Sequence, residues 1–399
     1  MATYAANAEQ QCERLLRILS AATFLIFFQA YMVAPMLPRL AAQFDVSALT
    51  IGFIVPAYLI PYGVSTLFYG MISDRMGRRR IMLASLFAFA VLTALTATSQ
   101  NPTQLIVWRL LTGIGASGVV PLALALIGVV YPFEKRGRPL GWLFGAMAGG
   151  MAFGSTFGVL MEPFVTWRGL FLAVSGLGFV ALVLLKRYAG LLGEAPAIRT
   201  VSFRDVLGGY AALLTEQRGG RTYVYVFLNS IFHSGVFTWL GLYFSQRYGL
   251  GEVGIGLALL GYGIPGFLLG PIVGRAADRW GRRWLIPLGL CIAALSAVTL
   301  ELRLPVFAAA VAVTVLSLGY DMTQPLFAGI VTTLDPKRAG QAMGLNVFTL
   351  FTGFGVGSLL FGEALRLGFN GALTVFALPQ LSIAVAAVAF FRGELPSSR

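Results

Sequence analysis

Charged side chains are scarce in this sequence of 399 residues. Asp, Glu, Lys and Arg together make up 11% of it, whereas hydrophobic residues make up 57% and the mean hydropathy is +0.80. A water-soluble globule of this length needs more polar surface than these residues supply. The composition therefore predicts an integral membrane protein.

Histidine, cysteine and lysine are also rare, and each shortage excludes a kind of chemistry. One histidine and two cysteines do not make a metal-ligand cluster, so we expect no metal and no other cofactor. All three lysines precede an arginine, so the chain has no Gly-Lys-Ser/Thr phosphate loop for ATP. No nucleophile has a recognisable base, and the sequence does not indicate an enzyme.

The hydrophobic residues are concentrated in about twelve runs, each near the length of about 20 residues that a helix needs to cross the hydrocarbon core. Helices are expected because every backbone polar group must be bonded inside the bilayer, and the runs lack the alternating pattern of barrel strands. The predicted all-α fold has twelve transmembrane helices, at 18–38, 50–72, 81–99, 103–131, 139–161, 168–186, 221–246, 253–274, 284–301, 304–333, 340–362 and 371–391.

The basic residues indicate how these helices are oriented. Of the 29 Lys and Arg residues, Arg109 lies inside a predicted span, five lie on one side of the membrane, and the remaining 23 lie on the side of the N-terminus. This asymmetry predicts that both termini are cytoplasmic, and we expect the membrane to be a bacterial inner membrane. The net charge of +13 then faces anionic lipid, and nucleic acid is not an expected partner.

A charged loop occurs twice in the chain at a spacing of 204 residues. The matched pairs are Gly70 and Gly274, Asp74 and Asp278, Gly77 and Gly281, and Arg78 and Arg282. Two repeats in the same order, each with an even number of crossings, are related by an axis along the membrane normal. We therefore expect two pseudo-symmetric six-helix bundles, at residues 1–186 and 221–399.

Residues 187–220 form the longest polar interval and are predicted to be a cytoplasmic linker between the bundles. Within it, apolar residues recur at helical spacing between 203 and 214, which indicates a short helix lying in the membrane interface. We expect this linker to be a tether packed under the bundles, with a regulatory role as the alternative.

Three more motifs accompany the repeated loop: Arg109 to Gly115 (RLLTGIG), Arg136 to Gly141 (RGRPLG) and Trp167 to Phe171 (WRGLF). With these motifs the whole chain resembles the major facilitator superfamily, most of all its twelve-helix drug:proton antiporters. The resemblance implies that two rocking bundles alternate access to a midplane site, and we expect a monomer. The chain departs from the antiporter pattern in the fifth helix, where the stretch from Gly154 to Val159 lacks a proline and one glycine.

In the family that the chain resembles, the repeated loop latches the cytoplasmic side when the cavity opens outward. Gly70 would let another helix come close, Gly77 would make a tight turn, and Asp74 would face the positive end of a helix. The alternative is that the arginines only fix the topology. The predicted latch residues are Gly70, Asp74, Arg75, Gly77, Arg78, Gly274, Asp278, Arg279, Gly281 and Arg282.

Arg109 and Asp321 are the formal charges predicted to lie deep in spans, where a charge is costly enough to suggest function. Arg109 matches the family's fourth-helix arginine, which faces the cavity and is implicated in proton coupling; the alternative is a structural anchor to carbonyls. Asp321 is the candidate protonation or cation site, or else a structural carboxyl between helices. The position that duplicates Asp321 in the first half is Ser117, which lies about 12 Å from Arg109 along a helix. Arg109 and Asp321 are therefore expected at different depths, and we expect no direct salt bridge between them.

His233 is the sole histidine and falls in the seventh predicted span, with Asn229 one turn before it. Its ordinary pKa suits a proton relay, and the alternative is a hydrogen bond to a neighbouring helix. Other polar and aromatic residues are candidates to line a cavity for an amphipathic molecule: Gln29, Tyr31, Tyr58, Tyr62, Tyr262, Gln324 and Asn346.

The predicted function is secondary active transport by alternating access, with export of a small lipophilic or amphipathic compound in exchange for protons. Neutral or monocationic lipophiles fit better than multiply charged cations because the first half has no acid inside a helix; anions that pair with Arg109 are also an option. One alternative, kept open by the fifth-helix departure, is an uptake symporter or facilitator for a specific metabolite. Another is a membrane protein that handles lipid or senses a ligand. The fold does not determine the substrate.

Overall fold

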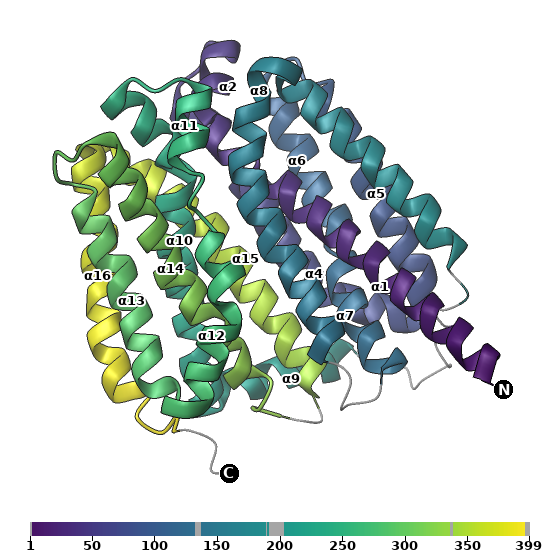
Figure 1. Cartoon of the computed structure of the whole chain (residues 1–399). Coiled ribbons are helices and arrows are strands. Elements are labelled where there is room, and N and C mark those ends of the chain that lie inside the picture. The colour runs from purple at the N-terminus through teal and green to yellow at the C-terminus, as the bar shows by residue number, and fades with distance from the viewer. Residues whose placement is uncertain (1, 132–136, 189, 191–202, 336–337, 396–399) are drawn as a thin grey trace.

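The computed structural model describes residues 2–131, 137–188, 190, 203–335 and 338–395. Long helices run side by side, and both termini lie near one end of the molecule (Figure 1). We call that end, which also carries α9 (Phe203–Thr215), the terminal face. The opposite end, with α2 (Leu37–Phe44) and α11 (Glu252–Ala258), is the distal face.

The helices divide into a first half and a second half. The first half contains α1 (Ala2–Tyr31), the 3-10 turn η1 (Ala34–Met36), α2, α3 (Ala48–Gly52), α4 (Pro56–Met76), α5 (Arg78–Ala97), α6 (Pro102–Ala116), α7 (Val119–Val130) and α8 (Gly137–Arg187). The second half contains α10 (Gln217–Tyr248), α11, α12 (Ile264–Trp280), α13 (Arg282–Thr299), α14 (Val306–Val331), α15 (Ala339–Ala364), the 3-10 turn η5 (Leu365–Leu367) and α16 (Gly368–Phe390).

The twelve predicted crossings account for these helices. Eight helical stretches of the described chain are long and apolar enough to span a membrane, and two of them, 138–187 and 339–390, each contain two predicted crossings. The remaining two crossings are α10 and the pair α11–α12. The protein is therefore an all-α, multi-pass membrane protein with twelve transmembrane helices.

Several crossings are broken at places that hydropathy does not reveal. The first crossing leaves its helix after Tyr31 and continues as η1 and α2, and the fourth is divided between α6 and α7. The eighth breaks before α12, where Gly263 has a φ of +80° that glycine adopts without strain. The fifth and sixth crossings form one helical run, α8, which turns at Thr166 with a φ of +63°.

Helix packing follows the distribution of small residues. In the first half α1 lies along α8, and a Cβ added at Gly154 would collide with the backbone of Phe28. In the second half α10 lies along α15, and a Cβ at Gly357 would collide with the backbone of Ile231. The halves meet mainly through α4 against α15 and α8 against α11. Bare glycine backbone thus sets how closely the helices within each half approach.

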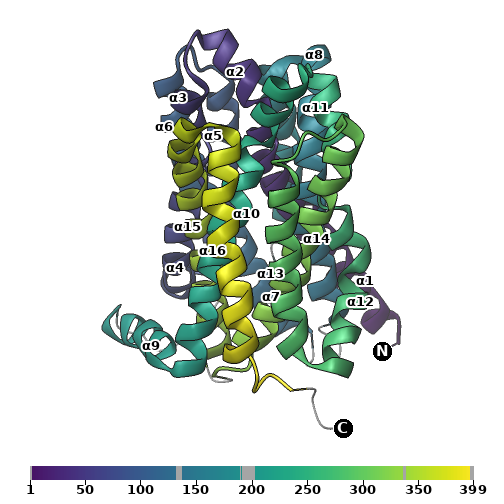
Figure 2. The same ribbon diagram turned by 90° about the vertical axis from the view of Figure 1, so that its left-hand side faces the viewer.

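Helix α9 occupies the stretch in which the sequence indicates a short interfacial helix. It lies at the terminal face and runs crosswise to the long helices (Figure 2). Tyr210 Oη donates to the carbonyl of Leu67 on α4 at 3.2 Å, and Gln341 Nε2 on α15 donates to the carbonyl of Val206 at 2.8 Å. The helix therefore contacts both halves. Linker residues 191–202 lie outside the described residues.

Candidate functional site

Aromatic rings from the two halves meet where the halves face each other. The contacts, as distances between ring centroids, are Tyr62–Phe351 at 4.4 Å, Tyr31–Phe237 at 5.6 Å, Phe27–Phe351 at 5.8 Å and Tyr31–Phe354 at 6.3 Å. We call these six residues and Tyr58, whose ring stacks on Tyr62 at 5.9 Å, the seam. Every seam residue is at most 5% exposed. Any motion that parts the halves here must separate these rings.

Arg109 is fully buried beside the seam and is held within the first half. Its guanidinium donates to the backbone carbonyls of Gln29, Ala30 and Ile54 at 3.2 Å each, and to Gln29 Oε1 at 2.9 Å. Its Cζ lies 4.3 Å from the centre of the Tyr58 ring, a cation–π contact. These bonds use four of the five guanidinium donors, so the geometry favours the structural anchor in this conformation.

Asp321 lies on α14 in the second half, and its charge acts on a tyrosine of the seam. Its Oδ2 accepts a hydrogen bond from Ser317 Oγ at 2.8 Å, and the same hydroxyl accepts one from the Gly263 amide at 2.8 Å. The carboxylate is close enough to the phenols of Tyr31 and Tyr262 for its charge to act on both. A carboxylate of one half therefore interacts with a seam tyrosine of the other.

His233 is buried in the second half and contacts Tyr262, the residue before Gly263. Its Nε2 lies 2.7 Å from the hydroxyl of Tyr262, and its ring stacks on Tyr320 with centroids 3.5 Å apart. Tyr320 immediately precedes Asp321 in the chain. The imidazole is thus bonded to a phenol, and the amide of the next residue, Gly263, shares Ser317 with the Asp321 carboxylate. Groups of this kind can pass a proton. The bond to Tyr262 also makes His233 a link between α10 and the break before α12.

Asn229 is one turn from His233 but is used differently. Its Nδ2 donates to Thr323 Oγ1 on α14 at 2.8 Å, and its Oδ1 accepts from Gln380 Nε2 on α16 at 2.9 Å. The side chain is fully buried among these helices. This geometry favours a structural role for Asn229, joining three helices of the second half.

Of the thirteen buried side-chain polar atoms without a partner among the described residues, six belong to predicted cavity residues. In the described part of the chain they include Gln29 Nε2, Gln324 Nε2, Asn346 Oδ1 and the hydroxyls of Tyr31, Tyr58 and Tyr62. An unpaired buried group costs about 1–3 kcal/mol, and such groups are few in native proteins. The three tyrosines among them belong to the seam, and the role of these residues in binding a substrate stays a prediction. Tyr262, in contrast, is paired with His233.

The two glycine-arginine loops have the same backbone geometry. Gly77 and Gly281 end α4 and α12 with φ of +92° and +78°, which permits the tight turn in both copies. The close approach expected at Gly70 is not found, since a Cβ there would have no neighbour within 4 Å. Helix α4 instead meets α15 at Gly63, nearer the seam, where a Cβ would touch Phe351.

The remaining latch residues are only partly described. Arg75 and Arg279 are exposed at the terminal face, and Arg78 begins α5. The backbone amide of Arg282 donates to the carbonyl of Glu394 at 2.9 Å. The side chains of Asp74 and Asp278 and position Gly274 lie outside the description, so the latch stays a prediction.

Glu394 is a charged residue that the sequence did not single out. It is 6% exposed and forms hydrogen-bonded ion pairs with Arg218, at 2.8 Å from each carboxylate oxygen, and with Arg221 at 2.9 Å. Burial by itself raises the Glu394 pKa, but the bonds from Arg218 and the charges of Arg218, Arg221 and Arg282 outweigh it, so the pKa lies below its usual value. Glu394 lies far from Arg218 and Arg221 in the sequence, so the sequence alone does not reveal this cluster.

Glu162 lies at the end of the fifth predicted crossing and is 3% exposed. Arg39 Nε on α2 lies 3.2 Å from Glu162 Oε1 on α8 and 3.8 Å from Glu252 Oε1 on α11. Glu162 belongs to the first half and Glu252 to the second. Arg39 therefore joins the halves at the distal face. The sequence shows an arginine and two acidic residues near the ends of predicted crossings. It does not show that these three residues lie close together.

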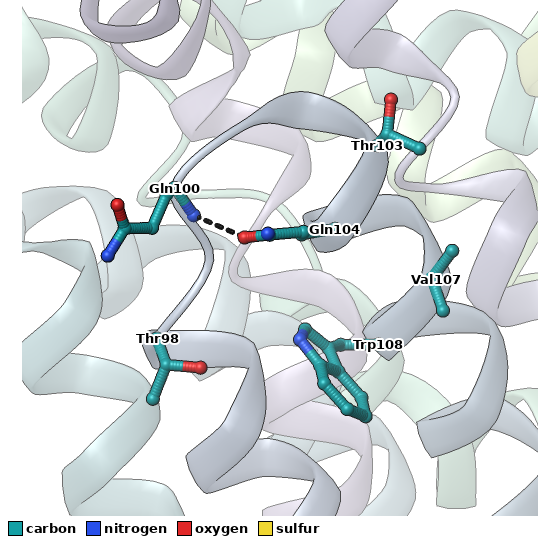
Figure 3. Close-up of a pocket in the computed structure, with 6 residues that line it drawn as sticks. All are labelled: Thr98, Gln100, Thr103, Gln104, Val107 and Trp108. Carbon is teal, nitrogen blue, oxygen red and sulfur yellow. Dashed lines mark hydrogen bonds between the residues drawn. The ribbon is translucent and has the colours of Figure 1, made fainter.

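An open surface hollow lies at the distal end of α5 and α6 (Figure 3). Its lining comes from one hairpin of the first half, and the Gln100 amide donates to Gln104 Oε1 across it at 2.8 Å. The lining residues are Thr98, Gln100, Thr103, Gln104, Val107 and Trp108. No charged side chain and no residue of the second half contributes to the lining, so we do not assign function to this hollow.

These observations define a class of protein. Twelve helices in two related halves, with buried charges and unpaired polar atoms where the halves meet, are the features of a secondary membrane transporter. The chain belongs to the Major Facilitator Superfamily, which it matches over residues 19–358 and 222–399.

Proteins that are similar to this chain in sequence have names that point to different substrates. The chain is 26% identical to the MFS-type transporter YceJ of Bacillus subtilis, covering 85% of this chain and 86% of that one. It is 26% identical to a gallate transporter of Pseudomonas putida, covering 92% and 89%. It is 31% identical to multidrug resistance protein 3 of Bacillus subtilis, but over 34% of this chain and 27% of that one.

Solved structures share the fold at low identity. A bacterial homologue of the lysosomal transporter Spinster, inward-facing and occupied, has a TM-score of 0.75 at 15% identity and covers 94% of this chain and 95% of its own. The human organic anion transporter MFSD10 has a TM-score of 0.73 at 16% identity and covers 94% and 99%. These similarities establish the architecture and leave the substrate open.

Proposed function

We propose that this protein is a proton-coupled exporter of small lipophilic or amphipathic compounds, similar to the drug:proton antiporters of its family. Two bundles, residues 1–186 and 221–399, rock about the seam, and the linker 187–220 joins them on the cytoplasmic side. Both termini are cytoplasmic in this proposal, so the terminal face is the inner face. The protein acts as a monomer in the inner membrane, with protons and one small-molecule substrate as its partners.

Asp321 carries the proposal, because it is a carboxylate inside a membrane-spanning helix. A charge at this depth is costly, and binding a proton or a cation lowers the cost. A cation near Asp321 favours the ionised carboxylate, whereas a bound proton removes the charge that holds the cation. Proton and substrate thus compete at Asp321, which is the coupling that an exchanger needs.

The neighbours of Asp321 support a path for the proton. Ser317 donates a hydrogen bond to the carboxylate, and His233 bonded to Tyr262 lies in the same cluster. Arg109 has a different part in this proposal. It fixes Gln29 and Tyr58, so that the first-half wall of the seam keeps its shape while the halves move.

Transport into inside-out vesicles tests this function. We expect a lipophilic fluorescent cation to accumulate in vesicles that contain the wild type and are energised by an inward-acid proton gradient. A proton uncoupler should abolish the accumulation, and Asp321→Asn should reduce it to the level of empty vesicles, because an amide cannot exchange a proton. Glu363→Gln is the matched control, since Glu363 is 60% exposed and pairs with Arg366 away from the seam.

Uncoupler-insensitive uptake, or full activity of Asp321→Asn, would overturn proton exchange at Asp321. The second candidate function is uptake of an aromatic acid, which the similarity to a gallate transporter favours. Gradient-driven uptake of gallate into right-side-out vesicles, without export of the cation, would support that alternative.

A further inference from the structure

The seam is closed by aromatic rings of one half that pack against aromatic rings of the other. Tyr62 of the first half lies 4.4 Å from Phe351 of the second, and Tyr31 lies 5.6 Å from Phe237. Alternating access requires these rings to separate, and separation removes their mutual contact. A flat aromatic molecule between them would restore a stacking partner to both sides.

The hydroxyls of the seam tyrosines differ from those of other buried tyrosines. Tyr223 donates to the carbonyl of Ala342 at 3.1 Å, and Tyr243 donates to the carbonyl of Leu300 at 2.8 Å. The hydroxyls of Tyr31, Tyr58 and Tyr62 have no partner among the described residues, although these residues are equally buried. The unpaired phenols thus lie where the halves meet, whereas Tyr223 and Tyr243 are satisfied by backbone carbonyls and Tyr262 by His233.

Most of the unpaired groups of the predicted cavity residues can donate a hydrogen bond. Besides the three hydroxyls, Gln29 Nε2 and Gln324 Nε2 carry amide hydrogens without a partner, and Asn346 Oδ1 is an unpaired acceptor. The nearby cation, Arg109, already binds Gln29 Oε1 and three carbonyls. The seam therefore offers donors to an uncharged acceptor but no uncommitted positive charge to an anion. The carboxylate of Asp321 also repels an anion.

We propose that the seam binds planar aromatic compounds that carry a hydrogen-bond acceptor, such as a ring carbonyl, and no negative charge. The ring system stacks between Tyr62 or Tyr31 of the first half and Phe351 or Phe237 of the second. The acceptor receives a hydrogen bond from the hydroxyl of Tyr31 or Tyr62. This proposal narrows the substrate class of the proposed exporter, and it rests on that function in taking the seam as the transport site.

Four commercial compounds test separately whether binding needs a planar aromatic ring system, a hydrogen-bond acceptor and the absence of negative charge. Xanthone is planar, aromatic and neutral with a carbonyl; xanthene lacks the carbonyl; dicyclohexyl ketone lacks the aromatic plane; and xanthone-2-carboxylate adds a negative charge. Each would be equilibrated by dialysis against the purified full-length protein in nanodiscs, with empty nanodiscs to subtract partition into lipid. We expect the wild type to bind xanthone about tenfold more tightly than any of the other three.

Variants assign the acceptor contact to the seam. The double variant Tyr31→Phe/Tyr62→Phe keeps both rings and removes two hydroxyls. We expect it to bind xanthone about 3- to 10-fold more weakly while its affinity for xanthene is unchanged, because one neutral hydrogen bond is lost. Tyr243→Phe is the matched control, since its hydroxyl is bound to Leu300, and it should keep the wild-type preference.

Three results would overturn the inference: equal affinity for xanthone and dicyclohexyl ketone, an unchanged xanthone preference in the double variant, or tighter binding of xanthone-2-carboxylate than of xanthone. The vesicle assay keeps the two proposals distinguishable. Uncoupler-sensitive export of the lipophilic cation without the expected probe preference refutes the substrate class alone. The expected preference without export refutes the proposed function alone.

Discussion

Buried tyrosines of this protein fall into two groups at the scale of single residues. Tyr243 and Tyr223 have hydroxyls bound to backbone carbonyls, so these hydroxyls contribute to the folded state. Tyr62 and Tyr58 have hydroxyls without a partner in the described chain, so these hydroxyls oppose folding unless a ligand binds them. The same residue type therefore serves stability in one place and, in our proposal, binding in another.

A stability measurement distinguishes the two groups. We expect Tyr62→Phe to leave the free energy of unfolding within about 0.5 kcal/mol of the wild type or to raise it, because the lost hydroxyl is unpaired. Tyr243→Phe should lower it by about 1 kcal/mol, because the Leu300 carbonyl loses its donor. Thermal unfolding in detergent, followed by tryptophan fluorescence, gives both values. A larger loss for Tyr62→Phe than for Tyr243→Phe would contradict the assignment.

At the scale of helices, Glu394 joins the terminal-face ends of α10, α13 and α16. Its carboxylate binds Arg218 and Arg221 at the start of α10, and its carbonyl accepts from the amides of Arg282 and Arg283 at the start of α13. The residue follows the end of α16. One side chain and one carbonyl thus fix the ends of three helices.

This cluster predicts how stability depends on pH. Because the Glu394 pKa is lowered in the folded protein, the ionised carboxylate stabilises the fold above the ordinary value of 4.5, and this contribution is lost as the pH falls through the lower folded pKa. Glu394→Gln should therefore be less stable than the wild type at pH 7, and the difference should shrink below about pH 4.5. Unfolding temperatures of both proteins from pH 7 to pH 3 check this, and a constant difference would contradict it.

At the scale of the whole molecule, closure between the halves involves two kinds of contact. The seam rings close the interior, and Arg39 joins Glu162 and Glu252 at the distal face. The ion pair of Arg39 with Glu162 lies within the first half, whereas the ion pair of Arg39 with Glu252 joins the two halves. Removing the Glu252 charge alone therefore weakens the closure without leaving Glu162 unpaired.

We expect Glu252→Gln to shift the equilibrium toward a distal face that is open. The pair is partly exposed and worth roughly 0.2–1 kcal/mol, so the open population should rise about 1.4- to 5-fold. Spin labels at Ala42→Cys and Ser245→Cys, which line the hollow between α2 and α10, would report the distance in a background with Cys12 and Cys291 replaced. Glu363→Gln is the control; an unchanged distance distribution in Glu252→Gln would contradict the prediction.

The positions of helices followed from composition because the bilayer imposes a length of apolar chain on every crossing. Breaks such as those at Gly263 and Thr166 did not, because the hydropathy of a run is the same whether its backbone is continuous or turned. Arg109 and Asp321 were recognised as charges inside spans, since position in a run is a local property, but of the two only Arg109 is fully buried. Their partners come from distant parts of the chain, so the carbonyls that hold Arg109 were not predictable.

The sequence by itself determined that this protein crosses a membrane twelve times in two repeated halves, because burial of apolar runs and an offset of 204 residues are properties of the chain order. Only the tertiary structure decided which side chains are satisfied. It tied Asn229 into the packing of the second half and left Tyr31, Tyr58 and Tyr62 unpaired at the seam. Hydrogen bonding depends on which helices meet and on the face each presents, and that is fixed only when both halves have packed.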